Sequence, residues 1–213
     1  MKLKYLIVGT GRSGTAYMSE LFRSSGMKSA HEGVFTVDGW KYAREVDETS
    51  QLLHNIEVES SWMAAPFLNK KELDDTIIIH AIRNPLKTIS SIVCTKLLSD
   101  DLLSNKKNPF TLFIQNHMPK VFNYSNEVDR VTYFYIYWNK LIERYADLTF
   151  KVEDKPDKLF EKLKIDITGK ELYANTKHNN KQRDSDAIVS YDEIPNDVLR
   201  QKLKIAANKY GYN

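Results

Sequence analysis

A glycine-rich turn links the first apolar run of the chain to its first amphipathic segment, and it constrains the fold more than any other feature. Residues 6–8 are Leu-Ile-Val, a continuous apolar run typical of a strand buried on both faces. Gly9, Gly11 and Gly14 follow within six residues, and apolar side chains then recur at helical spacing over residues 15–22. A strand, a glycine loop and a helix in this order direct backbone N–H groups and a helix N-terminus at an anion such as phosphate.

The loop fits two common nucleotide-binding patterns to different degrees. A Walker A loop needs Gly-x-x-x-x-Gly-Lys-Ser/Thr, and here Thr15 follows Gly14 directly, so the lysine is missing. The dinucleotide fingerprint Gly-x-Gly-x-x-Gly is present, and Glu32 stands about 20 residues downstream, where a ribose-binding acid is expected. The sequence therefore leaves open a Rossmann-type oxidoreductase that uses NAD or FAD, bound through Gly9, Gly11 and Gly14.

A third interpretation gives weight to the polar residues of the loop. Arg12 places a cation inside it, and Ser13 and Thr15 place hydroxyls at the start of the helix. This arrangement suits a phosphate whose leaving oxygen gains negative charge. The plain alternative is a tight turn between strand and helix with a solvated arginine.

Composition and charge exclude several classes of protein. A chain of 213 residues with 42% hydrophobic and 28% charged residues predicts one globular domain over residues 1–213. The net charge of +3 does not indicate a nucleic-acid binder, although it allows a local basic pocket. Cys94 is the only cysteine, so no intrachain disulfide can form, and no apolar run is long enough for a signal peptide or a membrane span. We expect a cytoplasmic protein.

Alternating strand and helix patterns predict an α/β fold, with a central parallel sheet covered by helices on both faces. Residues 27–30 make a poor buried strand, residues 38–39 indicate a turn, and residues 42–53 are ambiguous, with helix as one option. The expected strands are 6–8, 56–60, 76–82 and 148–152, and the expected helices are 15–22, 64–68, 85–97, 131–145, 159–163 and 198–206.

The strand at 76–82 ends in a cation instead of an acid. A magnesium-dependent P-loop enzyme usually has an aspartate on a neighbouring strand to hold the metal, whereas this strand runs into Arg83. Asn84 and Pro85 then favour a helix start. Ser91 lies roughly 160° around that helix from its apolar stripe, and therefore points away from the core. These features argue against an ATPase or kinase and for a second anion-binding point, although a surface arginine and a solvent-facing serine are the plain alternatives.

Both motifs resemble those of sulfotransferases that use 3′-phosphoadenosine 5′-phosphosulfate (PAPS). Gly9 followed by residues 12–15, Arg-Ser-Gly-Thr, resembles their 5′-phosphosulfate loop. Arg83 and Ser91, eight residues apart, resemble their 3′-phosphate motif, and residues 150–163 are similar to the next strand and helix of many bacterial members. Many members have lysine in place of Arg12, while others, including tyrosylprotein-type enzymes, have arginine. The basic stretch 176–183 is either their 3′-phosphate loop or an ordinary solvated loop.

The resemblance implies a single-domain, P-loop-NTPase-like sulfotransferase fold and a PAPS-dependent reaction that needs no metal. It assigns cofactor binding to Gly11, Arg12, Ser13, Gly14, Thr15, Arg83 and Ser91.

The same resemblance suggests how the transfer would proceed. Arg12 would stabilise the leaving phosphate, and Glu32 resembles the general base of several members. His31 is its rival as the base, because imidazole titrates near neutral pH. The acceptor would be a small molecule or a glycan, with residues 96–124 as a substrate lid. A non-catalytic nucleotide-binding protein remains an alternative, and the oligomeric state stays open.

Overall fold

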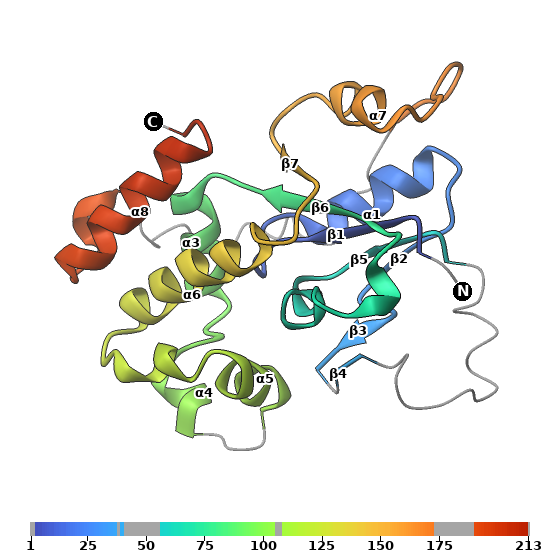
Figure 1. The fold of residues 1–213 in the computed structure, drawn as a ribbon. Helices are drawn as coiled ribbons and strands as arrows, with labels where there is room; N and C mark the ends of the chain where they lie inside the picture. Colours follow the sequence, from blue (N-terminus) through green and yellow to red (C-terminus); the bar gives the residue numbers. More distant parts are fainter. Residues whose placement is uncertain (1–2, 38, 41–55, 105–107, 173–189, 213) are drawn as a thin grey trace.

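A five-stranded parallel sheet forms the centre of the protein, as the strand pattern predicts (Figure 1). The computed structural model describes residues 3–37, 39–40, 56–104, 108–172 and 190–212. The strand order is β2-β5-β1-β6-β7, and every neighbouring pair is parallel. These strands are β1 (Tyr5–Val8), β2 (Ser29–His31), β5 (Val58–Ser60), β6 (Ile77–Ile82) and β7 (Leu148–Lys151).

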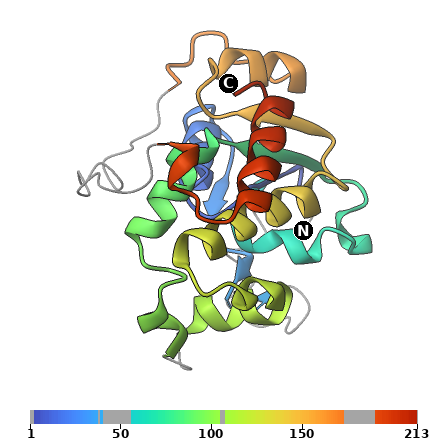
Figure 2. The same ribbon diagram turned by 90° about the vertical axis from the view of Figure 1, so that its left-hand side faces the viewer.

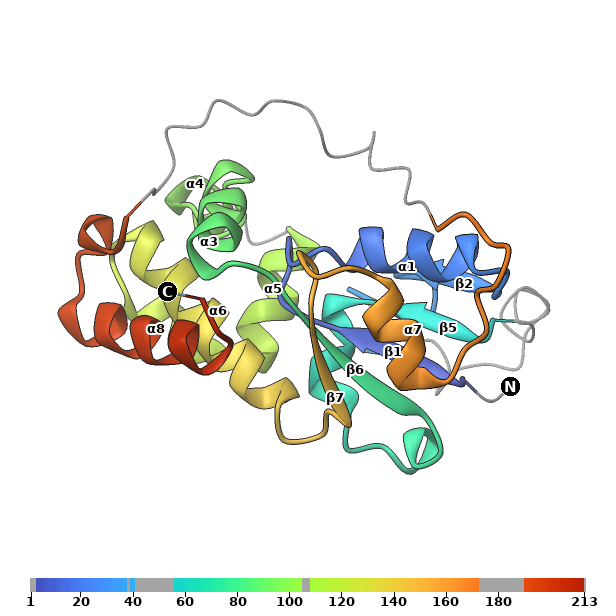
Figure 3. The same ribbon diagram turned by 90° about the horizontal axis from the view of Figure 1, so that it is seen from above.

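Helices cover both faces of this sheet (Figures 1 and 3). Successive residues of β1 point to opposite faces, so Ile7 joins the core beneath α1 (Thr15–Ser24) and α7 (Asp157–Leu163). Leu6 joins the larger core beneath α3 (Pro85–Cys94) and α6 (Glu127–Ile142). The α8 helix (Asp197–Lys209) packs on α6 (Figure 2). The remaining elements are α4 (Asp100–Ser104), α5 (Pro109–His117) and the 3-10 helices η2 (Trp62–Phe67), η3 (Lys71–Leu73), η4 (Pro119–Asn123) and η6 (Tyr191–Glu193).

Local sequence signals set the ends of the two helices that flank the site. Pro85 is the first residue of α3, and the Asn84 side chain accepts a hydrogen bond from the Lys87 N–H at 3.1 Å, so the predicted start is confirmed. Gly26, with φ 88°, follows the end of α1, as a helix-stopping glycine should.

One strand forms where the sequence made a strand unfavourable. Ser29–His31 is β2, which pairs only with β5 at the edge of the sheet. An edge strand is covered less than a central one, and Ser29 and Ala30 are half-buried, so this strand does not need an apolar sequence. The antiparallel strands β3 (Phe35–Thr36) and β4 (Gly39–Trp40) form a second, two-stranded sheet, and the turn predicted at 38–39 includes residue 38, which lies outside the described residues.

The segment 96–124 is more regular than its sequence indicates. It forms α4, α5 and η4, and it places Phe113, Ile114 and Val121 in the larger core. Along α3 and the residues just after it, Ile89 and Ile92 are fully buried, whereas Leu86, Val93 and Leu97 pack at the margin of the larger core.

Two further expectations fall on residues that the structure does not describe. Residues 42–53 and 176–183 lie outside the described ranges, so the helix and the basic loop predicted there stay predictions. Within the described part of the chain, none of the helices combines the length and the apolar character that crossing a lipid bilayer requires.

Candidate functional site

The two predicted anion-binding motifs meet at one edge of the sheet. Strands β1 and β6 are parallel neighbours, with Val8 aligned to His80, so the segments that follow them emerge side by side. The Arg83 guanidinium donates a hydrogen bond from Nη1 to the carbonyl oxygen of Arg12 at 3.2 Å. Residues 71 positions apart in the sequence are thus in direct contact at the carboxyl ends of the strands.

A side-chain hydrogen bond also connects the glycine loop to α3. Nε of Arg12 donates to Oγ of Ser91 at 2.9 Å, and both side chains are half-buried. Because the Ser91 hydroxyl accepts this bond, its own proton stays available for donation to a ligand. Arg12 has φ 68°, a left-handed conformation that costs a non-glycine residue free energy and that is often found at functional sites.

The base of the loop is packed too tightly for any side chain at Gly9. A Cβ atom there would lie 2.1 Å from Ser13 Oγ and 2.4 Å from the Ala81 carbonyl oxygen. The Ser13 hydroxyl is therefore beneath the loop, next to β6. The backbone N–H of Ser13 donates to the Thr10 carbonyl oxygen at 3.1 Å. The hydroxyls of Thr10 and Ser13 are buried and have no hydrogen-bond partner among the described residues.

The N-terminus of α1 faces the same edge without a capping side chain. Gly14 is its N-cap in a left-handed conformation with φ 98°, and no side chain accepts from the first turn. The first N–H groups of a helix have no partner within the helix, and α1 has no acidic residue in its first turn. Together with Arg12 and Arg83, this helix end forms a site suited to a phosphate.

His31 lies beside the first residue of α1, and Glu32 lies beside His31. Oγ1 of Thr15 is 3.1 Å from Nε2 of His31, and the same Nε2 is 3.5 Å from Oε1 of Glu32. The Thr15 carbonyl oxygen accepts a bond from the Ser60 hydroxyl at 2.8 Å, which ties α1 to β5. Glu32 has φ 55°, so a second site residue adopts the left-handed region.

Burial shifts the pKa values of the two predicted bases in opposite directions. Desolvation raises the pKa of Glu32, and the indole N–H of Trp62 partly opposes this by stabilising the charged form. Desolvation lowers the pKa of His31, and the charge of Glu20 opposes the shift. A neutral imidazole and a carboxylate of increased basicity are thus expected near neutral pH, which suits either of them to accept a proton.

Arg83 is held in place by contacts that the sequence did not reveal. The Tyr135 hydroxyl of α6 donates to the Arg83 carbonyl oxygen at 3.3 Å. The next N–H, of Asn84, donates to Oε1 of Glu153 at 2.9 Å, and Oε2 of Glu153 accepts from the Tyr212 hydroxyl at 2.6 Å. No short-range signal could predict these bonds, because they join segments far apart in the chain.

Trp62 is a further site residue that the sequence analysis missed. The ring of Trp62 lies 3.9 Å from an ideal Cβ position on Gly11, so it borders the glycine loop. It also stacks on Phe110 of α5 with ring centroids 6.4 Å apart, and Phe110 is 39% exposed. Residues 96–124, the predicted lid, therefore reach the neighbourhood of the loop through this aromatic pair.

Glu59 is buried completely, with an exposure of 0%, although it is a charged residue in a short strand whose apolar residues, Ile56 and Val58, alternate with polar ones. The reason is tertiary: β5 lies between β2 and β1, and the turn at residues 33–35 covers it. Burial raises the pKa of Glu59 to about 8, against the opposing effect of hydrogen bonds from that turn.

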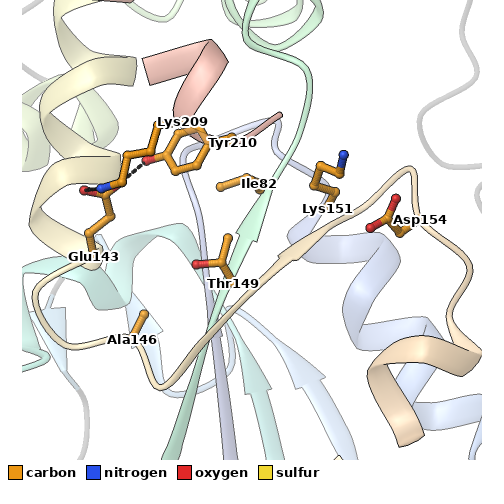
Figure 4. A pocket seen from close by; sticks show the side chains of 8 residues that line it. All are labelled: Ile82, Glu143, Ala146, Thr149, Lys151, Asp154, Lys209 and Tyr210. Atoms are coloured by element: carbon orange, nitrogen blue, oxygen red, sulfur yellow. Dashed lines mark hydrogen bonds and ion pairs between the residues drawn. The ribbon is translucent and has the colours of Figure 1, made fainter. Parts of the chain in front are cut away.

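A cavity of about 370 Å³ lies elsewhere, between β7 and the ends of α6 and α8 (Figure 4). Three of its charged groups have partners: Glu143 binds Lys209 at 2.7 Å and accepts a bond from the Tyr210 hydroxyl, and Lys151 lies over the Tyr212 ring. None of the predicted site residues lines it. The lining residues are Ile82, Glu143, Ala146, Thr149, Lys151, Asp154, Lys209 and Tyr210.

Comparison with known proteins does not assign this chain to a family. A scan against models of protein families gives no match for the chain, and a search of curated proteins gives none either.

The packing around the loop makes a matched pair of glycine substitutions informative. We expect Gly9→Ala to lower the free energy of unfolding by roughly 1–3 kcal/mol, because the new methyl group overlaps Ser13 and the backbone of β6. Gly11→Ala, whose methyl group would meet no atom closer than 3.9 Å, should stay within about 1 kcal/mol of the wild type. Urea unfolding measures both values, and equal losses would contradict this account of the loop.

The buried carboxyl of Glu59 predicts a pH dependence of stability with a definite sign. Its pKa in the folded protein, about 8, exceeds the ordinary 4.5, so the folded state binds an extra proton between these values. Stability should therefore fall as pH rises from about 5 to 8, by at most about 1.4 kcal/mol per pH unit from this group. Urea unfolding of Glu59→Gln beside the wild type isolates the effect, and a difference that does not vary with pH would refute it.

Proposed function

We propose that this protein is a PAPS-dependent sulfotransferase, which transfers a sulfuryl group to an acceptor hydroxyl or amine. The observation that supports the proposal most is the bond from Arg12 to Ser91 at 2.9 Å. This bond joins two motifs that lie far apart in the sequence and that each resemble this enzyme class separately. One nucleotide with phosphates at its 5′ and 3′ positions would explain why both motifs are needed.

The residues of the site divide into two phosphate-binding groups. The N–H groups at the start of α1 would hold the 5′-phosphate, and Arg12 would stabilise the oxygen between phosphorus and sulfur as its bond to sulfur breaks. Arg83 and the hydroxyl of Ser91 would hold the 3′-phosphate. Such a transfer needs positioning and charge stabilisation more than covalent participation of the protein.

Proton transfer from the acceptor would fall to Glu32 or His31. As the new bond between sulfur and the acceptor oxygen forms, the bond to the phosphate oxygen breaks, and the acceptor proton passes to the base. Glu32 is favoured because its raised pKa makes it a stronger base, while His31 lies within 3.5 Å and stays the rival. The products are a sulfated acceptor, either a small molecule or a glycan, and adenosine 3′,5′-bisphosphate.

The topology of the sheet weakens the dinucleotide alternative. In the usual dinucleotide-binding order, 3-2-1-4-5-6, the strand that carries the ribose-binding acid pairs with the strand before the glycine loop. Here β2, which precedes Glu32, pairs with β5 and is separated from β1 by it. The kinase alternative lacks both the loop lysine and an acid at the end of β6, where Arg83 stands.

Nucleotide binding tests the proposed cofactor through Arg83. Adenosine 3′,5′-bisphosphate at about 100 times its Kd should stabilise the wild type by about 2.7 kcal/mol, which is roughly 5–10 °C in Tm. Arg83→Ala should weaken the bisphosphate at least about tenfold while leaving adenosine 5′-monophosphate nearly unchanged, because only the former loses a charged hydrogen bond. Thermal shift and calorimetric titration measure these changes.

The controls separate this proposal from its rivals. Arg144→Ala removes an exposed arginine just beyond α6 and should leave both affinities unchanged. Preference of the wild type for NAD or ATP, or equal losses of the two adenosine nucleotides in Arg83→Ala, would count against the proposal. Bisphosphate binding without sulfate transfer to any acceptor class would favour a non-catalytic binder.

A pair of substitutions decides which residue is the base. Glu32→Gln should reduce kcat by about 10²–10⁴ while bisphosphate affinity stays within about twofold, because the carboxylate acts on the acceptor and not on the nucleotide. His31→Gln should reduce kcat less, since its ring contacts Thr15 but is not the favoured proton acceptor. Steady-state kinetics with radiolabelled PAPS would reverse the assignment if His31→Gln caused the larger loss.

A further inference from the structure

Glu59 is a fully buried acid that the proposed reaction does not use. It is the middle residue of β5 and is aligned with Leu6 of β1 on one side and Ala30 of β2 on the other. Leu6 belongs to the core on the α6 face, so this carboxyl is on an otherwise apolar side of the sheet. A carboxyl group buried in such a place costs free energy unless hydrogen bonds compensate for its lost hydration.

The carboxyl group contacts the turn that directly follows Glu32. Oε1 of Glu59 accepts a hydrogen bond from the Val34 N–H at 3.1 Å, and the neighbouring backbone of Gly33 and Phe35 also lowers the pKa of this carboxyl against the effect of burial. An ideal Cβ on Gly33 would lie 3.6 Å from Oε2 of Glu59, so the turn packs directly on the acid. The middle of this turn thus depends on one buried side chain for its hydrogen bond.

Hydrogen bonds therefore fix the backbone both at Glu32 and just after it. Its own N–H donates to the Ser60 carbonyl oxygen at 3.1 Å, and the residues after it are bound to Glu59. Between these two attachments it adopts φ 55°, a conformation that a non-glycine residue keeps only when its surroundings impose it. The Ser61 hydroxyl adds a bond to the Phe35 carbonyl oxygen at 3.1 Å.

We propose that Glu59 is a positioning residue, which fixes the turn at residues 33–35 and thereby holds the Glu32 carboxylate beside His31. This inference rests on the proposed function for the role of Glu32, but not for the role of the turn. Removal of the acceptor would leave the buried Val34 N–H without its partner, and the turn would rearrange to reach water. Glu32 would then move away from the loop.

The charge of Glu59 fits this role. The charged group that faces it is Glu32 across the turn, while the aligned residues of β1 and β2 are apolar. Burial keeps the carboxyl neutral near pH 7. A neutral carboxyl still accepts from backbone N–H groups but does not repel the carboxylate that it positions.

Two substitutions and two measurements test the proposal. Glu59→Leu removes the acceptor at similar size, and it should lower kcat at least about tenfold while the KM for PAPS stays within about twofold. Glu59→Gln keeps an acceptor oxygen at the same place, and it should retain kcat within about threefold. The acid limb of the kcat profile, which reports Glu32, should shift to lower pH in Glu59→Leu as that carboxyl reaches solvent.

Amide hydrogen exchange supplies a readout that does not need activity. In Glu59→Leu the amides of Gly33, Val34 and Phe35 should exchange at least about tenfold faster, while those of β6 keep the wild-type rate. If Glu59→Leu does not fold, Glu59→Asp, which withdraws the carboxyl by one methylene group, should show the same split between kcat and KM and the same exchange pattern.

The outcomes separate the two proposals. A wild type that transfers no sulfate overturns the proposed function, and the exchange rates at residues 33–35 then decide the positioning role alone. An active wild type with unchanged kcat in Glu59→Leu, or with equal effects on kcat and on the KM for PAPS, overturns the role of Glu59. Unchanged exchange at the turn also overturns it.

Discussion

The parallel pairing of β1 with β6 is the interaction on which the site depends. Four residues of β1 are in register with β6, and this places the loop after Val8 next to Arg83. The hydrogen bonds between the strands, more than any contact within the site, hold two cationic side chains at one edge of the sheet. Without an anion the two guanidinium groups repel each other. Each donates a hydrogen bond to a polar acceptor, Arg83 to the Arg12 carbonyl oxygen and Arg12 to the Ser91 hydroxyl.

Strain is concentrated around this edge. Four non-glycine residues in the described part of the chain have a positive φ, and two of them, Arg12 and Glu32, are proposed site residues. Each is fixed by contacts from other elements: Arg12 by Ser91 and Arg83, and Glu32 by the turn that follows it. The surrounding sheet supplies the free energy that keeps these side chains in a conformation the isolated segments would not adopt.

The aromatic cluster around Trp62 connects the site with the remainder of the molecule. Trp62 borders Gly11, and its carbonyl oxygen accepts a bond from the Trp138 indole of α6 at 3.0 Å. On its other side it packs on Phe110 and Phe113 of α5. A change in the position of α5 would therefore reach the glycine loop through one rigid ring.

The sequence by itself determined the elements with strong local signals. Residues 6–8, the glycine loop and the Asn-Pro start of α3 depend on side chains within a few positions of one another, so their patterns predict β1, α1 and α3 directly. Only the tertiary structure decided that β2 is a strand, that Glu59 is buried, and that Arg12 reaches Ser91. Each of these outcomes depends on which strands become neighbours, and pairing between segments tens of residues apart leaves no periodic trace in the chain.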